Sequence, residues 1–375
     1  MPDVPTCHRI ASRRKLVVRS FSIKGNRMHS FDGHNDVLLR LWRQGPGGVE
    51  AFLDGDAKGQ LDLLRAQEGG MVGGLYAIFV PSESSRPAIE PTDTVPYDVP
   101  VPPPPELTHA QRATFEMVSL LLRIAEGSDG RVRLARSVAE IRSAKAAGAH
   151  APVLHIEGCE AIDADLRMLD VFYAAGLRSL GPVWSRSNIF GHGVPFRFPS
   201  SPDTGDGLTP AGKALIKRCN DLRILIDLSH LNEQGFWDVA RLSRAPLVAT
   251  HSNAHALCAS SRNLTDKQLA AIRESGGLVG VNYAVSFLRV DGRRDATTPL
   301  DTVVDHIAYL IERLGEDGVA LGSDFDGALI PEGIGSAAGL PNLVAAMRAR
   351  QFGEVAIEKI CFENWMRVLT QTWGE

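Results

Sequence analysis

The sequence predicts an α/β protein whose main part folds as a single (β/α)8 barrel, the TIM-barrel architecture. Eight short strand-like apolar runs recur from Met28 onward, and helical stretches separate them, as repeated βα units require. A chain of 375 residues can form one such barrel, although the length alone would also fit two ordinary domains. Several runs end in side chains that bind metals or move protons, at the ends that share one face of such a barrel.

Composition excludes several classes of protein. The formal net charge is −4, which gives no reason to expect nucleic acid or an anionic membrane surface as a partner. No apolar run approaches the ~18 uninterrupted residues of a membrane-spanning helix. The five cysteines are scattered without a CxxC pair, so we expect reduced thiols and a cytoplasmic location rather than a disulfide framework.

Residues 1–27 differ from the rest of the chain. They are rich in arginine and lysine, and Asp3 is their single acidic residue. They lack the apolar stretch of a secretory signal, so we expect a disordered basic leader followed by one folded domain over residues 28–375. An organellar transit peptide and a working start at Met28 are alternatives that the sequence leaves open.

The first expected strand ends at Asp32-Gly33-His34-Asn35-Asp36. His34 and Asp36 are two residues apart, so in a strand both side chains leave the same face. An imidazole beside a carboxylate makes half a site for a divalent metal such as zinc. The other seven strands are expected at residues 74–80, 152–158, 178–184, 223–230, 246–253, 277–283 and 318–327.

The segments between these strands are predicted to be helices and loops. Residues 81–105 are so rich in proline that we expect a long surface loop, which either covers the active-site face or is a spacer. The C-terminal residues are expected to be helical and to pack against the outside of the barrel. The other expected elements are helices at 56–67 (Leu61, Leu63 and Leu64 inward), 108–126 (N-cap Thr108) and 137–147, and an accessory strand at 132–134.

Five of the strands end in candidate metal ligands or acid–base groups. Because the carboxyl ends of barrel strands meet on one face, these side chains are expected to converge. They are His34, Asp36, Glu157, His230, His251 and Asp324. His155 lies deeper on the same face as Glu157, and we interpret it as a hydrogen-bonded core residue rather than a ligand.

These six residues nearly suffice for two divalent ions. Glu157 can bridge, so that one ion binds His34, Asp36 and Glu157, while the other binds Glu157, His230 and His251. We expect two Zn²⁺ ions, although manganese or cobalt would accept the same ligands. Two such ions lower the pKa of a bridging water, and Asp324 would pass its proton to the leaving amine.

The ordered motifs resemble those of the membrane (renal) dipeptidases, peptidase family M19 of the amidohydrolase superfamily, in the soluble bacterial branch. The resemblance covers residues 29–370 and implies a binuclear zinc barrel that hydrolyses dipeptides by a metal-bridged hydroxide. Some members accept a D-residue at the C-terminal position. The motifs are Asp-Gly-His34-Asn-Asp36, Glu157-Gly, Ile-Asp-Leu-Ser-His230, Thr-His251-Ser and Ser-Asp324-Phe-Asp-Gly.

The resemblance also assigns substrate-binding residues. Arg262 stands where the family keeps an arginine for the free carboxylate of the substrate, which its planar fork suits. Trp184 stands where better-known members have a histidine that contacts the substrate carbonyl, so this contact is weakened or moves to Asn188 or His192. We include Tyr283, which ends the seventh run, among the substrate-binding residues.

Other activities compete with a dipeptidase. The main alternative is a related amidohydrolase that acts on N-acyl-amino acids, another small amide or a lactone. The third hypothesis is a non-catalytic protein that uses the barrel for binding. The expected partner is a small dipeptide, and a homodimer is allowed for. Neither nucleic acid nor a membrane span is expected.

Overall fold

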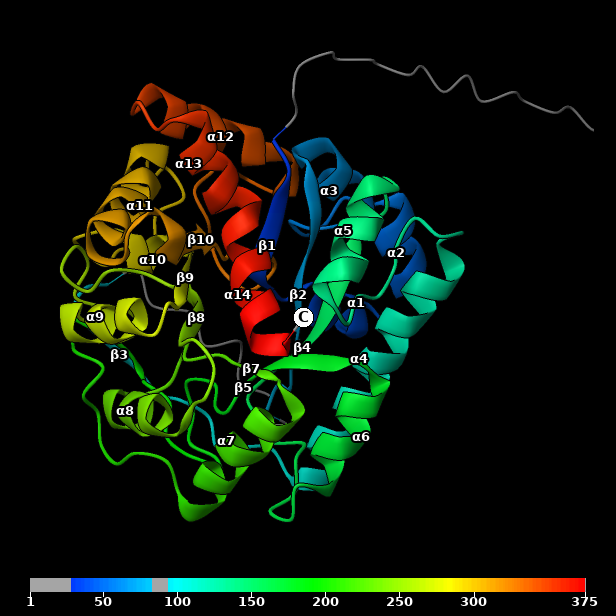
Figure 1. Ribbon diagram of the computed structural model, residues 1–375, viewed down its shortest axis with the longest axis vertical. Coiled ribbons are helices and arrows are strands. Elements are labelled where there is room, and N and C mark those ends of the chain that lie inside the picture. Colours follow the sequence, from blue (N-terminus) through cyan, green and yellow to red (C-terminus); the bar gives the residue numbers. More distant parts are fainter. Residues whose placement is uncertain (1–27, 83–93, 375) are drawn as a thin grey trace, which may run out of the picture.

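The computed structural model describes residues 28–82 and 94–374, so the predicted leader lies outside the described residues. Two parallel sheets form its centre (Figure 1). One sheet has five strands in the order β1 (Ser30–Asn35), β2 (Met71–Phe79), β4 (Ala151–Glu157), β5 (Leu177–Gly181) and β7 (Leu225–Ile226). The other has three strands in the order β10 (Val319–Leu321), β9 (Leu278–Val281) and β8 (Val248–Ser252).

Parallel bridges link the edges of the two sheets. Asp227 pairs with Val248 after the end of β7, and Asn35 pairs with Phe325 after the end of β10. At the second junction the Asp324 amide donates to the His34 carbonyl at 3.0 Å. The first and last strands therefore lie side by side in a curled, barrel-like parallel sheet.

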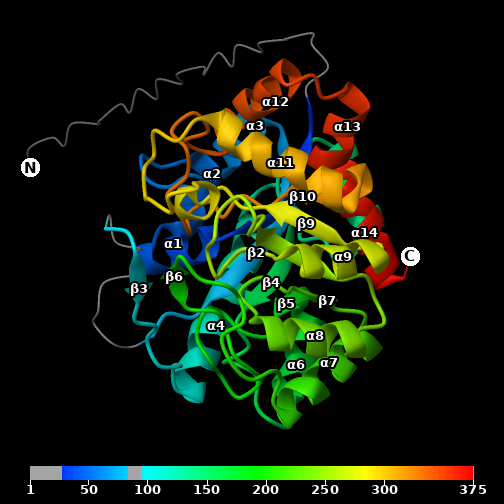
Figure 2. The same ribbon diagram turned by 90° about the vertical axis from the view of Figure 1, so that its left-hand side faces the viewer.

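Helices surround this sheet (Figure 2). They follow the strands in alternation, which is the βα pattern that the sequence predicted. The helices are α1 (Val37–Gln44), α2 (Gly48–Asp54), α3 (Leu63–Gly69), α4 (Leu107–Gly127), α5 (Val138–Ala146), α6 (Arg167–Ala175), α7 (Pro210–Leu222), α8 (Glu233–Leu242), α9 (Asp266–Glu274), α10 (Val285–Leu288), α11 (Leu300–Leu314), α12 (Leu340–Ala349), α13 (Glu354–Glu358) and α14 (Asn364–Trp373). Within the described residues, no helix is long and apolar enough to cross a membrane.

The C-terminal helix covers one end of the sheet, not only its outside. Trp365 of α14 shares a buried cluster with Phe31 of β1, Val248 of β8 and Leu278 of β9. These strand residues lie near the N-terminal ends of their strands. The C-terminal helix therefore closes the N-terminal end and leaves the carboxyl ends free to carry a site.

Three expected elements differ from the structure. The helix expected at residues 56–67 is α3, which begins at Leu63. The Asp62 carboxylate caps α3 by accepting from the Arg65 amide at 2.8 Å. Leu64 is 48% exposed rather than inward. Helix α4 begins after Glu106, so Thr108 is not its N-cap. Residues 83–93 of the predicted proline-rich loop lie outside the described residues, and the described part contains a short strand, β3 (Tyr97–Val99), which pairs antiparallel with β6 (Phe196–Phe198).

Some strands are shorter than predicted, and the backbone turns sharply in the residues that follow two of them. His230, after β7, has a φ of 68°, and Asp324, after β10, has a φ of 60°. Such left-handed backbone ends a strand and is costly for a residue other than glycine. The predicted accessory strand is reduced to one bridge between Val132 and His150.

Candidate active site

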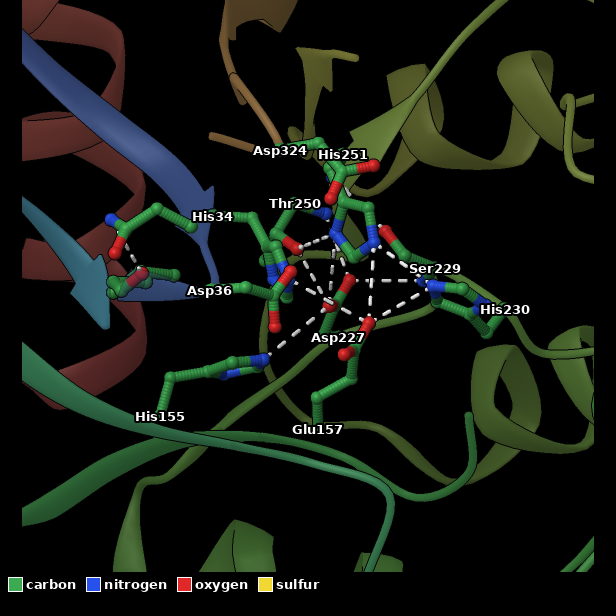
Figure 3. A network of polar contacts seen from close by, with 12 residues as sticks. His34, Asp36, His155, Glu157, Asp227, Ser229, His230, Thr250, His251 and Asp324 are labelled. Carbon is green, nitrogen blue, oxygen red and sulfur yellow. Dashed lines mark hydrogen bonds and ion pairs between the residues drawn. The ribbon is translucent and has the colours of Figure 1, made fainter. Parts of the chain in front are cut away.

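The structure brings the six converging residues together at the carboxyl ends of the strands (Figure 3). Strands β1, β4 and β8 carry His34, Glu157 and His251, whereas the other three residues follow the ends of their strands. Asp36 belongs to the last group, because β1 ends at Asn35 and α1 begins at Val37. Strand ends therefore position the whole cluster, as the sequence predicted.

Glu157 lies at the centre of the cluster. Its Oε1 atom is 2.9 Å from His230 Nε2, 3.4 Å from His251 Nε2 and 3.6 Å from His34 Nε2. Ligand atoms of Glu157, His230 and His251 lie within 4.8 Å of one another, and so do those of His34, Asp36 and Asp324. One carboxylate thus faces both groups of candidate ligands.

The polar groups of the cluster fit a metal better than they fit each other. Both ring nitrogens of His34 are buried without a hydrogen-bond partner among the described residues, which is costly unless a ligand satisfies them. The Nε2 atoms of His230 and His251 lie 3.0 Å apart. Two ring nitrogens that converge on carboxylate oxygens provide the donor set that zinc prefers.

Electrostatics keep two of the three histidines neutral and leave a proton on the third, His34, when no metal is bound. Burial, with the nearby charges of Asp36 and Asp324, holds the pKa of Glu157 well above its usual range despite the opposing effect of His34. Burial opposes the charged form of His34 too, but Glu157, Asp36 and Asp324 outweigh it and raise its pKa to about 10. Burial lowers the pKa of His230 and His251 well below the usual value, so both rings are neutral, as metal-ligating histidines must be. The carboxylates around His34 therefore favour a positive charge at this point, which a bound metal ion would supply in place of the proton.

Hydrogen bonds behind the cluster orient two histidines. Ser185 Oγ lies 2.7 Å from His230 Nδ1, and Thr250 Oγ1 lies 2.8 Å from His251 Nδ1. Asp227 accepts from the Thr250 hydroxyl at 2.6 Å and from the Thr250 amide at 2.8 Å. Such outer contacts fix which nitrogen faces the site. Asp227 was not among the predicted site residues. Its carboxylate lies within the apolar strand run that leads to His230, and this position could have indicated a buried polar role.

Asp324 is held in place from several directions. Asn282 Nδ2 donates to its Oδ2 atom at 2.9 Å. A Cβ atom at Gly327 would collide with the carboxylates of both Asp36 and Asp324, so this position needs glycine. Burial raises the pKa of Asp324, and His34 partly offsets the effect.

A second aspartate anchors the loop that carries Asp324. Asp326 has a φ of 66° and accepts from the Gln60 amide at 2.6 Å and from Arg40 Nε at 3.0 Å. Gln60 Oε1 in turn accepts from the Asp326 amide at 2.7 Å. No local pattern in the sequence could have paired residues this far apart along the chain.

A cavity of about 1230 Å³ opens onto the cluster. Asp36, Glu157, His230 and Asp324 all contribute to its lining. Trp184, a predicted substrate-binding residue, lines the same cavity. The candidate ligands are therefore accessible to a small molecule.

Arg262 is buried beside the cluster without an ion-pair partner. It is 3% exposed, and its Nη2 atom donates to the His251 carbonyl at 3.2 Å. Among the described residues no carboxylate lies within ion-pair distance of its guanidinium. Burial lowers its pKa, while Asp324 and Glu157 raise it. A buried, unpaired guanidinium is costly, and an anionic ligand group would compensate it.

Of the predicted substrate residues only Trp184 lines the cavity; Arg262, Asn188, His192 and Tyr283 do not. Asn188 is occupied by its own loop: its Nδ2 donates to the Pro182 carbonyl, and its Oδ1 accepts from the Phe190 amide. His192 Nδ1 contacts Ser187 Oγ at 2.9 Å. Tyr283 is fully buried, with its ring 5.8 Å from that of Phe325.

His155 shows the behaviour expected of a core histidine. It is fully buried, and its Nδ1 atom lies 2.8 Å from Ser179 Oγ. Burial lowers its pKa to about 3, so the ring is neutral.

Comparisons with known proteins identify relatives of this chain. An uncharacterized protein from the pqqA 5′ region of Klebsiella pneumoniae is 52% identical over 261 residues, covering 70% of this chain and 96% of that protein. Dipeptidase tcpJ of Claviceps purpurea is 27% identical over 345 residues, covering 91% of this chain and 76% of that protein.

A solved structure supports the same relationship. The metallo peptidase from Rhodobacter sphaeroides, liganded with a phosphinate mimic of the dipeptide L-Ala-D-Ala, matches with a TM-score of 0.90 and 54% identity. The match covers 93% of this chain and 100% of the Rhodobacter sphaeroides chain. The model of the membrane dipeptidase family, peptidase family M19, matches residues 24–373. This chain therefore belongs to the membrane dipeptidase family M19 and is a metal-dependent dipeptidase.

Proposed function

We propose that the chain is a zinc enzyme that hydrolyses dipeptides with two metal ions in a closed (β/α)8 barrel. The observation that carries this proposal is the grouping of six ligand-type residues at the carboxyl ends of parallel strands, with Glu157 facing both groups. The bridges at Asp227 and Asn35 support closure of the barrel.

The residues present fit two zinc ions. His34, Asp36 and Glu157 would hold one ion, and Glu157, His230 and His251 would hold the other. When bound, the ions would polarise the substrate carbonyl and lower the pKa of the attacking water.

The protein's own groups would position the substrate and move protons. Asn282 donates to one oxygen of Asp324, and the other oxygen would accept a proton from the attacking water and return it to the leaving amine. Arg262 would bind the free carboxylate of the dipeptide through two parallel hydrogen bonds. The mimic bound by the Rhodobacter sphaeroides relative supports a dipeptide substrate, including one with a D-residue at the C-terminal position.

Hydrolysis of a defined panel tests this function. Metal-stripped protein would be assayed with and without zinc on L-L and L-D dipeptides, their N-acetyl forms and their C-terminal amides. We expect zinc-dependent cleavage of the free dipeptides, lost on amidation of the C-terminus. Turnover of the N-acetyl compounds alone would contradict the dipeptidase function and favour the alternative, an amidohydrolase that acts on N-acyl-amino acids.

We also propose a cytoplasmic location. The support is that Cys159, Cys219, Cys258 and Cys361, the cysteines within the described residues, are all free and buried. Fractionation of cells that express the tagged chain would test it, and recovery outside the cytoplasm would contradict it.

A further inference from the structure

Apolar side chains gather on the cavity wall near the metal site. Phe196, Ala284 and Phe287 form a hydrophobic cluster separate from the main core, and Val99, Trp184 and Ala328 pack against it. All six residues line the cavity. Apolar groups that face a cavity instead of joining the core offer a surface to an apolar part of a ligand.

Four aromatic rings form a continuous series along this wall. The ring of Trp184 lies 4.8 Å from that of Phe79 and 5.4 Å from that of Phe196. The rings of Phe196 and Phe287 are stacked at 6.2 Å with planes 3° apart. We call Phe79, Trp184, Phe196 and Phe287 the aromatic wall.

The aromatic wall begins beside a candidate metal ligand. The ring of His230 lies 5.9 Å from that of Trp184 and 6.3 Å from that of Phe196. A molecule bound in the cavity beside His230 therefore lies within reach of these rings, and one of its side chains can rest on them.

A buried ion pair keeps the wall in place. The guanidinium of Arg186 lies 5.0 Å from the ring centre of Phe79 and 5.4 Å from that of Trp184. Arg186 donates to Glu160 at 2.7 Å and to the Val80 carbonyl at 2.6 Å. Its charge is compensated by Glu160, so Arg186 supports the rings and does not offer a partner to an acidic substrate. A preformed apolar surface binds without the cost of ordering it.

The neighbour of Phe287 indicates which end of the substrate the wall receives. The guanidinium of Arg262 lies 5.4 Å from the ring centre of Phe287. On the function proposed above, Arg262 binds the C-terminal carboxylate, so the C-terminal residue lies next to the wall.

We propose that the aromatic wall selects dipeptides with a large apolar or aromatic side chain at the C-terminal position. This inference rests on the proposed dipeptidase function. The cavity of about 1230 Å³ exceeds the common range of ligand pockets, which leaves room for such a side chain.

Five dipeptides separate the proposal from its alternatives. The zinc-loaded full chain would be assayed on Ala-Ala, Ala-Phe and Phe-Ala, each with the C-terminal residue in L and D form, and on Ala-Asp and Ala-Lys. We expect kcat/KM for Ala-Phe to exceed that for Ala-Ala by about 10- to 100-fold, the range that added apolar contact gives in a fitted pocket. Equal rates, or a preference for Phe-Ala, Ala-Asp or Ala-Lys, would overturn the inference while leaving a dipeptidase. Cleavage of none of these substrates would overturn the proposed function itself, and the inference with it.

Variants tie the preference to the wall. In Trp184→Leu and Phe287→Leu, the ratio of kcat/KM for Ala-Phe over Ala-Ala should fall at least fivefold, because contact with the C-terminal side chain is lost. Phe115→Leu is the matched control, since Phe115 lies on α4, is 44% exposed and does not line the cavity. Thermal melts show which variants are folded. An unchanged ratio in either folded wall variant would overturn the inference.

Discussion

The two sides of the substrate cavity are built in different ways. The side with the candidate metal ligands comes from strand ends, where His34, Glu157 and His251 occupy β1, β4 and β8. The aromatic wall comes mainly from connections, because Trp184 follows β5, Phe196 lies in the short strand β6 and Phe287 lies in the four-residue helix α10. Strands fix the chemistry in a rigid frame, whereas the connections set the shape of the site.

The largest effect is expected on the side with the candidate metal ligands. Glu157→Gln keeps the size of the side chain but removes the charge that faces three imidazoles. We expect loss of bound zinc and a fall in kcat of about 1,000-fold or more, because metal ions supply several kcal/mol of transition-state stabilisation. Zinc content and dipeptide turnover measure both effects. Glu116→Gln, at an exposed position on α4, is the control and should behave as wild type.

A smaller effect is expected at the boundary between the two sides. Arg262→Ala should lower kcat/KM for free dipeptides by about 100-fold, since the substrate carboxylate loses a charged hydrogen-bond partner. The poor turnover of C-terminal amides should stay unchanged, and zinc content should remain normal. An equal loss on free dipeptides and amides would show that Arg262 supports the fold and does not bind the carboxylate.

Asp227 lies behind the candidate ligands, and Asp227→Asn should lower the affinity for zinc. It weakens the acceptor that holds the Thr250 hydroxyl beside His251, so we expect zinc affinity to fall by about 10- to 100-fold. Competition with a zinc chelator measures the affinity. Excess zinc should restore much of the activity, and activity that zinc cannot restore would show a role other than orienting the ligand.

The smallest effect is expected in the loop that carries Asp324. Asp326→Asn weakens the contacts to Gln60 and Arg40, so Asp324 should be less well positioned. We expect kcat to fall about tenfold with little change in KM, as for other small displacements of a reacting group. A change confined to KM would contradict this role.

The clustering of the candidate metal ligands could be predicted because its signals are local. Each ligand stands at or just after an apolar run, and the barrel topology brings the ends of these runs together. The sequence therefore predicted that Glu157, His230 and Asp324 lie together without any knowledge of contacts. It also placed the eight strands of the central sheet, whereas it specified only a few of the helices.

The aromatic wall could not be predicted because its contacts are not local. Trp184 alone stood out, as a departure from a family motif, whereas Phe196 and Phe287 lie in segments without a helical or strand period. The pairing of β3 with β6 joins segments about a hundred residues apart, and the Asp326–Gln60 contact spans 266 residues. Asn188 and Tyr283 were chosen from motifs and run ends, and the structure places both away from the cavity lining.

The first measurement to make is a zinc titration of the metal-stripped chain, with bound zinc and hydrolysis of a free dipeptide followed together. A site bridged by Glu157 predicts two zinc ions per chain and full activity only when both are bound. Full activity with one ion, or two bound ions without hydrolysis of any dipeptide, would contradict the binuclear dipeptidase proposed here.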